Sequence, residues 1–181
     1  MQVRFTQAQL TDFLKRSMDK FFAREVEYIL SGIAERSLCG RLAIYMESLL
    51  EQHNMHGYFA DPECNRKQDG EIKTMLDEKE RVVKIQCDLI VHSRGNEEPD
   101  NLIAVEMKKS DHLESAKQSD KTRLRVLTKQ QGVFSTDGTA RPEHVAGYRL
   151  GIYIELDIKQ RTCLYEKYKG GDMIGSWMDR F

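Results

Sequence analysis

The sequence predicts an α/β protein with a mixed central β-sheet flanked by helices. Three observations indicate this class. Apolar residues recur at helical spacing through residues 10–49, β-branched runs follow at 82–92 and 102–109, and helical spacing then returns before two further strand-like runs. Such a mixed order is typical of one sheet with helices packed on its faces. The length of 181 residues fits a single domain spanning 1–181.

The N-terminal part, residues 1–54, is expected to form two helices that pack on the sheet. Thr6 and Gln9 have the spacing of a capping box, which starts the first helix there. Its end is expected at Ser31 and Gly32. The second helix follows from the apolar positions Ile33, Ala34, Leu38, Leu42, Tyr45 and Leu49.

Three strands are expected in the middle of the chain. Residues 58–66 form the first, and the polar stretch 67–81 reads as a loop. The segments 82–92, VVKIQCDLIVH, and 102–109, LIAVEMKK, are rich in residues that favour strands. Turn-forming residues at 93–101 join them, so these two strands are expected to form a hairpin.

A helix and two more strands complete the predicted order α-α-β-β-β-α-β-β. Helical spacing from Asp111 onward is carried by Leu113, Ala116, Leu124 and Leu127. Residues 148–156, YRLGIYIEL, read as a strand. Residues 161–168 are expected to pair with it across a turn at Asp157.

Composition narrows the classes of function. The net charge of −1 and the pI of about 6.5 argue against broad, non-specific coating of nucleic acid, which uses a strong basic excess. A nuclease remains compatible, because it needs only a local basic groove beside an acidic metal site. No apolar run approaches the roughly 20 residues that cross a bilayer, so no membrane is expected. The N-terminus lacks a secretory signal, which predicts a cytoplasmic location.

The cysteines argue against a structural zinc site. Cys39, Cys64, Cys87 and Cys163 lie far apart in the chain, and none of them forms a CxxC pair. Free, buried thiols are therefore expected.

Three charged residues mark the ends of the hairpin strands. Glu106 and Lys108 are two apart in a strand, so they point to the same face. Asp88 interrupts an apolar run on the neighbouring strand, where burial is costly unless the carboxylate is paired or bound to a cation. Asp88 and Glu106 could share a divalent metal. Magnesium prefers oxygen ligands and keeps several waters, so two carboxylates and the carbonyl of Met107 would suffice.

Asp88, a turn and then Glu106-Met107-Lys108 resemble the signature of the PD-(D/E)XK, or restriction-endonuclease-like, nucleases. The segments ERSLCGRLAIYMESL, ECNR, CDLIVH, AVEMKKS and GYRLGIYIEL are similar to a group of small uncharacterised bacterial members. The resemblance implies a core of a helix, a three-strand meander, a helix and a further strand. It also implies that Asp88 and Glu106 bind the metal and that Lys108 orients or deprotonates the attacking water. Glu35 matches a metal-site glutamate on the preceding helix, whereas Cys87 replaces the eponymous proline.

The sequence therefore predicts a nuclease that hydrolyses phosphodiester bonds through a metal-activated water. DNA is the expected substrate and Mg²⁺ the expected metal, with Mn²⁺ as a substitute. One alternative is a non-catalytic module that binds nucleic acid or protein on the same fold. Another is a metabolic or regulatory protein with a structural acidic cluster. In a fourth interpretation, Glu106 and Lys108 form a solvent-facing ion pair and local donors satisfy Asp88.

Further residues are candidates for nucleic-acid contact. Lys117, Lys121 and Arg125 recur every four residues, which fits either phosphate contact or a solvated helix face. Arg66, at the end of the first strand, could approach a phosphate. Asp120 falls on the apolar side of the helix, where a structural hydrogen bond or a basic neighbour is expected. His92 is expected to be exposed at a turn. Because no separate recognition domain is visible, strong sequence specificity would require a partner or a homodimer.

Overall fold

The computed structural model describes residues 5–62, 74–76, 82–84, 87–129 and 147–181. The helices are α1 (Gln7–Leu30), α2 (Glu35–Gln52) and α3 (Glu114–Thr128). The strands are β1 (Phe59–Pro62), β2 (Thr74–Leu76), β3 (Val82–Lys84), β4 (Leu89–His92), β5 (Asn101–Lys109), β6 (Leu150–Asp157), β7 (Thr162–Lys169) and β8 (Asp172–Arg180). Six strands form one sheet in the order β1-β4-β5-β6-β7-β8, while β2 and β3 form a separate two-stranded sheet.

The six-stranded sheet is mixed. Strand β4 runs antiparallel to both β1 and β5, and β6 runs parallel to β5. Strands β7 and β8 then continue in antiparallel pairs. The chain between β5 and β6 contains α3, as a parallel pair requires a long crossover connection. The predicted α/β class, with a mixed sheet and flanking helices, is confirmed.

The first helix begins and ends where the sequence predicts. The Thr6 side chain accepts a hydrogen bond from the backbone N–H of Gln9, and the Gln9 side chain accepts one from the backbone N–H of Thr6. This reciprocal pair is the expected capping box. After Leu30, Ser31 caps the helix and Gly32 takes a φ of +78°, which glycine adopts without strain.

Two parts of the strand prediction are wrong. The segment 82–92 is not one strand, because β3 ends at Lys84, β4 begins at Leu89, and β3 pairs with β2 from the predicted loop. Strand β8 is absent from the prediction, since most of its residues are exposed and it has no alternating apolar face. The β4–β5 hairpin and the pairing of β6 with β7 are confirmed.

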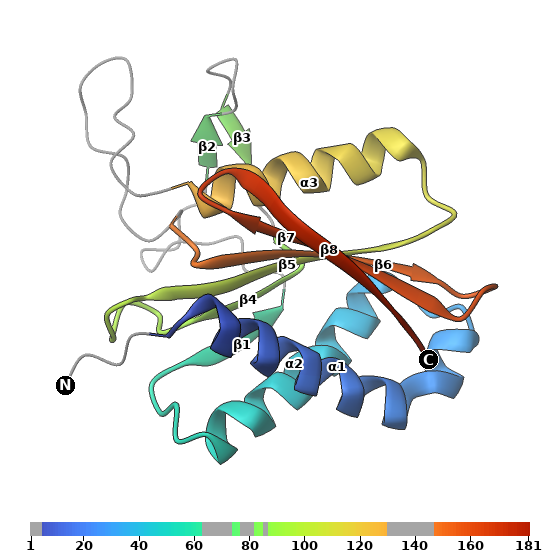
Figure 1. Ribbon diagram of the computed structural model, residues 1–181, viewed down its shortest axis with the longest axis horizontal. Helices are drawn as coiled ribbons and strands as arrows, with labels where there is room; N and C mark the ends of the chain where they lie inside the picture. The colour runs from blue at the N-terminus through green and yellow to red at the C-terminus, as the bar shows by residue number, and fades with distance from the viewer. Residues whose placement is uncertain (1–4, 63–73, 77–81, 85–86, 130–146) are drawn as a thin grey trace.

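The sheet separates two unlike helical layers (Figure 1). Helices α1 and α2 cover one face, where their apolar side chains and those of alternate strand residues form one large buried cluster. We call this the two-helix face. Its strand residues include Leu89, Val91, Ile103, Val105, Met107, Ile152 and Ile154. Helix α3 covers the opposite face, which we call the α3 face, and the apolar cluster there is smaller.

The α3 face brings helix and sheet very close at one glycine. A Cβ atom added to Gly151 would lie 2.8 Å from the Thr128 side chain and 3.1 Å from the Tyr168 side chain. Real Cβ atoms essentially never lie as close as the 2.8 Å contact, so any larger residue here would force Thr128 at the C-terminal end of α3 to shift. This contact sets the distance between the C-terminal end of α3 and the sheet.

Strand β5 leaves part of one edge open. Strand β4 pairs with β5 only as far as Val105, whereas β6 pairs with β5 as far as Lys109. The last residues of β5 therefore have a strand on one side only, within the described part of the sheet. The predicted site residues lie at this edge.

The far edge of the sheet is tied to α1 by aromatic contacts. The indole of Trp177 on β8 stacks on Tyr165 of β7 with ring centroids 4.5 Å apart. The Lys15 ammonium of α1 lies 5.1 Å from the indole centroid. Strand β8 is thereby connected to both its neighbouring strand and the first helix.

Cys39, Cys87 and Cys163 are buried free thiols, as the sequence predicts, and Cys64 lies outside the described residues. Across the described ranges, no helix is long and apolar enough to span a bilayer.

Candidate active site

Asp88 and Glu106 face each other at the open edge of β5. Leu89 pairs with Val105, and extending this register by one residue places Asp88 opposite Glu106. Directly opposed residues on neighbouring strands share a face of the sheet. The sequence-based expectation that these two carboxylates lie together is met by the register.

Asp88 also binds the backbone of β5. Its Oδ2 accepts a hydrogen bond of 2.9 Å from the N–H of Met107. The N–H and C=O of one strand residue point to the same edge, so the Met107 carbonyl is directed toward Asp88 as well. Burial raises the pKa of Asp88 above its ordinary value, although the Met107 N–H and the Lys108 charge act in the opposite direction.

Glu106 is fully buried, with a relative exposure of 0%. Its Oε1 accepts a 2.6 Å hydrogen bond from Nε of Arg123, while no N–H or O–H donor of the described residues binds its buried Oε2, and the Glu106 carboxyl interacts with the Asp88 carboxyl. Burial, and next the charge of Asp88, raise the pKa of Glu106 well above its ordinary value. A buried carboxylate oxygen without a donor is costly, which marks this position for a ligand or a proton.

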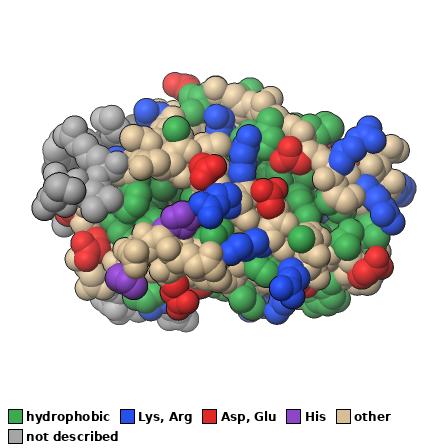
Figure 2. Space-filling view, turned by 60° about the horizontal axis from the view of Figure 1, so that its bottom comes forward, with side chains coloured by type: hydrophobic (Ala, Val, Ile, Leu, Met, Phe, Trp, Pro, Cys, Tyr) green, Lys and Arg blue, Asp and Glu red, His purple; other side chains and the backbone are tan. Residues whose placement is uncertain are grey.

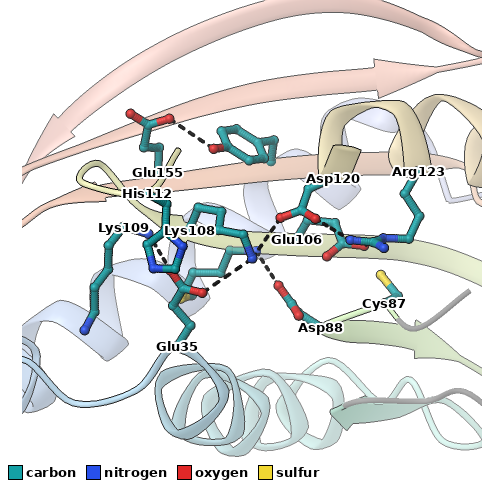
Figure 3. Close-up of polar contacts among 12 residues, drawn as sticks. Glu35, Cys87, Asp88, Glu106, Lys108, Lys109, His112, Asp120, Arg123 and Glu155 are labelled. Carbon is teal, nitrogen blue, oxygen red and sulfur yellow. Dashed lines mark hydrogen bonds and ion pairs between the residues drawn. The ribbon is translucent and has the colours of Figure 1, made fainter. Parts of the chain in front are cut away.

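Asp120 of α3 joins the two cations of the site (Figure 3). One of its oxygens pairs with Nη2 of Arg123, and the other lies 3.0 Å from Nζ of Lys108. The expectation that Asp120 contacts a basic residue is confirmed. Burial alone would lower the pKa of Lys108, but Asp120, Glu35 and Asp88 together raise it above its ordinary value. Lys108 is therefore a firmly charged ammonium.

Glu35, the first residue of α2, reaches the same edge from the two-helix face. Its Oε1 accepts a 2.7 Å hydrogen bond from the N–H of Lys109 and lies 3.1 Å from Nε2 of His112. Its Oε2 lies 3.4 Å from Nζ of Lys108. Figure 3 shows the Lys108 ammonium between Glu35 and Asp120, so Glu35 contacts the lysine of the site rather than the Asp88–Glu106 pair.

The interpretation of Glu106 and Lys108 as a solvent-facing ion pair is wrong. Glu106 is buried and pairs with Arg123, whereas Lys108 pairs with Asp120 and Glu35. Both side chains project toward the α3 face, as their spacing of two residues predicts.

The described residues offer few protein ligands for a divalent cation. Among the described residues, no three His, Cys, Asp or Glu side chains are close enough together to hold a metal ion. Asp88, the Oε2 of Glu106 and the Met107 carbonyl offer two carboxylates and one carbonyl on one edge. A magnesium ion that keeps several waters needs no more protein ligands than these.

The basic stripe of α3 is occupied by partners within the protein. Nζ of Lys117 lies 2.9 Å from Glu155, and Nζ of Lys121 lies 2.7 Å from Glu166. The third member, Arg125, donates a hydrogen bond to the Gly171 carbonyl. A solvated helix face is therefore the wrong interpretation, because the stripe faces the sheet. Phosphate contact stays a prediction that requires these cations to exchange partners, and Arg66 lies outside the described residues.

Sequence reasoning missed Arg123, His112 and the pairing of His92. The spacing of Asp120 and Arg123, three residues apart beside the apolar positions of α3, is the signal that could have suggested a buried ion pair. His92 is buried rather than exposed, because its Nε2 lies 2.8 Å from Asp61 of β1, a residue distant in sequence.

The surface agrees with the nearly neutral net charge. On the face shown in Figure 2, basic side chains are scattered among acidic ones instead of forming one extended basic patch. Any contact with nucleic acid on this face would therefore be local.

No known protein family, curated protein or solved structure matches the chain.

Proposed function

We propose that this protein is a metal-dependent nuclease of the PD-(D/E)XK type that hydrolyses phosphodiester bonds, with DNA as the expected substrate. One observation carries the proposal. At an open strand edge Asp88 and Glu106 lie opposite each other, no N–H or O–H donor of the described residues binds the buried Oε2 of Glu106, and the charge of Lys108 acts on Asp88.

The order of elements supports this assignment. Helix α2, the antiparallel strands β1, β4 and β5, helix α3 and the parallel strand β6 follow one another along the chain. This order is compatible with the helix, three-strand meander, helix and strand that the resemblance implies, if the paired strands β2 and β3 are an insertion in the meander.

The side chains of the site divide the chemistry among them. Asp88, Glu106 and the Met107 carbonyl would hold Mg²⁺ or Mn²⁺, and Glu35 would contribute through its contact with Lys108. Once bound, such a cation lowers the pKa of water and stabilises charge on the reacting phosphate. Lys108 would orient or deprotonate the attacking water and offset negative charge on the phosphate. Asp120 holds Lys108 in place.

The test is cleavage of supercoiled plasmid, linear duplex DNA, single-stranded DNA and RNA, each with Mg²⁺, Mn²⁺ or EDTA. We expect metal-dependent cleavage that is lost in Lys108→Ala and Asp88→Asn proteins. Losing a group that stabilises the transition state typically lowers rates by about 100-fold or more. The two site variants also control for contaminating nucleases, and Lys159→Ala, which removes an exposed lysine in the β6–β7 turn, is the matched substitution that should keep the activity.

Cleavage that survives in Lys108→Ala would remove Lys108 from the mechanism. Cleavage that persists in EDTA would contradict the metal requirement. Circular dichroism of each variant separates loss of activity from loss of fold.

One observation favours the non-catalytic alternative. Arg123 and Lys108 already neutralise Glu106 and Asp120, as they would in a site that never binds metal. A binding module would show no metal-induced rise in Tm, whereas a metal-dependent nuclease binds the ion in its native state and gains stability. Thermal unfolding with and without Mn²⁺ therefore distinguishes the two candidates even without a known substrate.

A further inference from the structure

Arg123 occupies an unusual position for a structural arginine. Its guanidinium bridges two acidic residues from different elements, with Nε bound to Glu106 of β5 and Nη2 bound to Asp120 on its own helix. The side chain is largely covered by protein, and burial raises the cost of leaving either carboxylate unpaired. The guanidinium of Arg123 lies between two carboxylates, and such a position between negative charges also favours the binding of a divalent cation.

Arg123 binds only one of the two carboxylate oxygens of Glu106. Its Nε binds Oε1, and no N–H or O–H donor of the described residues binds the buried Oε2. A guanidinium often binds a carboxylate through two parallel hydrogen bonds, and such a pair would satisfy both oxygens. The carboxylate of Glu106 is thus only half engaged, with its free oxygen on the side of the sheet that Asp88 shares.

The other bond of Arg123 makes release feasible. Nη2 remains on Asp120 when Nε leaves Glu106, because the guanidinium has five N–H donors in separate positions. Asp120 also keeps its contact with Lys108. Only a side-chain movement of Arg123 is needed to free both oxygens of Glu106.

We propose that Arg123 is an internal competitor of the divalent cation for the Glu106 carboxylate, so that the Arg123–Asp120 pair on α3 sets the metal affinity of the site. This inference rests on the proposed function, since it assumes the metal position at Asp88 and Glu106. In the metal-free protein Arg123 neutralises Glu106. In the metal-bound protein Arg123 remains on Asp120 and gives up Glu106.

Calorimetric titration of Mn²⁺ into the wild-type protein and its variants tests the competition. Arg123→Gln removes the competing charge and should lower the Kd for Mn²⁺ by about tenfold or more, the effect of one charge-assisted hydrogen bond. Arg16→Gln, which removes an exposed arginine from α1, is the charge-matched control and should leave the Kd unchanged.

The outcomes separate this inference from the proposed function. Equal Mn²⁺ affinity in the wild type and Arg123→Gln, with binding lost in Asp88→Asn, would overturn the competition and leave the metal site intact. No Mn²⁺ binding in either protein would reject the metal site and the competition together. Binding only in Arg123→Gln would support a competitor strong enough to exclude the metal.

A second measurement uses the wild-type protein, in case Arg123→Gln does not fold. The Nε–H of Arg123 gives an NMR signal in ¹⁵N-labelled protein, identified by its absence in Arg123→Lys. We expect this signal to shift and to exchange faster with water at saturating Mg²⁺, because its 2.6 Å bond to Glu106 is released. An unchanged signal while calorimetry shows bound Mg²⁺ would contradict the proposal.

Discussion

The helices are held on the two faces of the sheet by different kinds of contact. The two-helix face is covered by apolar side chains from α1 and α2 that form the larger buried cluster. The α3 face joins helix to sheet through ion pairs, in which Glu106, Glu155 and Glu166 of the strands meet cations of α3. Apolar burial contributes stability in proportion to area, whereas buried ion pairs contribute little net stability.

This difference indicates a division of labour between the faces. The two-helix face holds the strands together and sets the register that brings Asp88 opposite Glu106. The α3 face keeps charged groups in a partly buried position where their electrostatic interactions are strong. Stability and chemistry are therefore expected to respond to different substitutions.

The largest effect is expected from truncating the two-helix face. Leu42→Ala removes a fully buried side chain of α2 and should lower the free energy of unfolding by about 2–5 kcal/mol. Urea denaturation measures the change. Ile44→Ala on the same helix is the matched control, because this side chain is exposed and its loss should change stability by no more than about 0.5 kcal/mol. Equal losses at both positions would contradict the description of this face.

A smaller effect is expected where α3 approaches the sheet. Gly151→Ala places a Cβ against Thr128 and should cost about 1–3 kcal/mol, because α3 must move away. Gly40→Ala in α2 has open space around the new methyl group and should stabilise the helix by up to about 1 kcal/mol. Urea denaturation compares the two variants, and a stabilised Gly151→Ala protein would show that α3 is free to shift.

The smallest effect concerns pH, and its sign differs between two glutamates. The folded protein raises the pKa of Glu106 above its ordinary value of 4.5, so over a pH range above 4.5 this residue binds more proton in the folded protein than in the unfolded chain. The stabilisation from this proton is complete below pH 4.5 and is lost as the pH rises toward the raised pKa. Glu106→Gln should therefore gain stability relative to the wild type as the pH rises through this range.

Glu25 of α1 provides the comparison with the opposite sign. The hydrogen bonds of Arg41 and Tyr45 lower its pKa below the ordinary value of 4.5, so its contribution is present above that pH and is lost as the pH falls through the lowered pKa. Glu25→Gln should lose stability relative to the wild type as the pH rises toward neutrality. Urea denaturation in EDTA between pH 3 and pH 8 measures both variants, and slopes of the same sign would refute the assignments.

Local patterns predicted most of the fold. The capping box of Thr6 and Gln9, the break at Gly32 and the strands β5, β6 and β7 all follow from spacing and turn residues along the chain. Strand β8 escaped prediction because an edge strand with exposed positions has no apolar alternation. The division of 82–92 between two sheets depends on strand β2, so it is decided by pairing and not by composition.

The site was predictable in its strand residues but not in its partners. Asp88, Glu106 and Lys108 are visible because charge interrupts apolar strands, and the period of two places Glu106 and Lys108 on one face. The role of Arg123 depends on the packing of α3 over β5, which no local pattern encodes. The burial of His92 likewise depends on Asp61, which lies on the neighbouring strand β1 but 31 residues away in the sequence.

The stacked indole on β8 has a practical consequence for studying folding. Trp177 is the single tryptophan of the chain, so excitation of indole reports on one position alone. Its neighbours come from β7 and α1, which lie far apart in the sequence. During refolding, the intrinsic fluorescence of Trp177 therefore reports when β8 packs against β7 and α1, and no added label is needed.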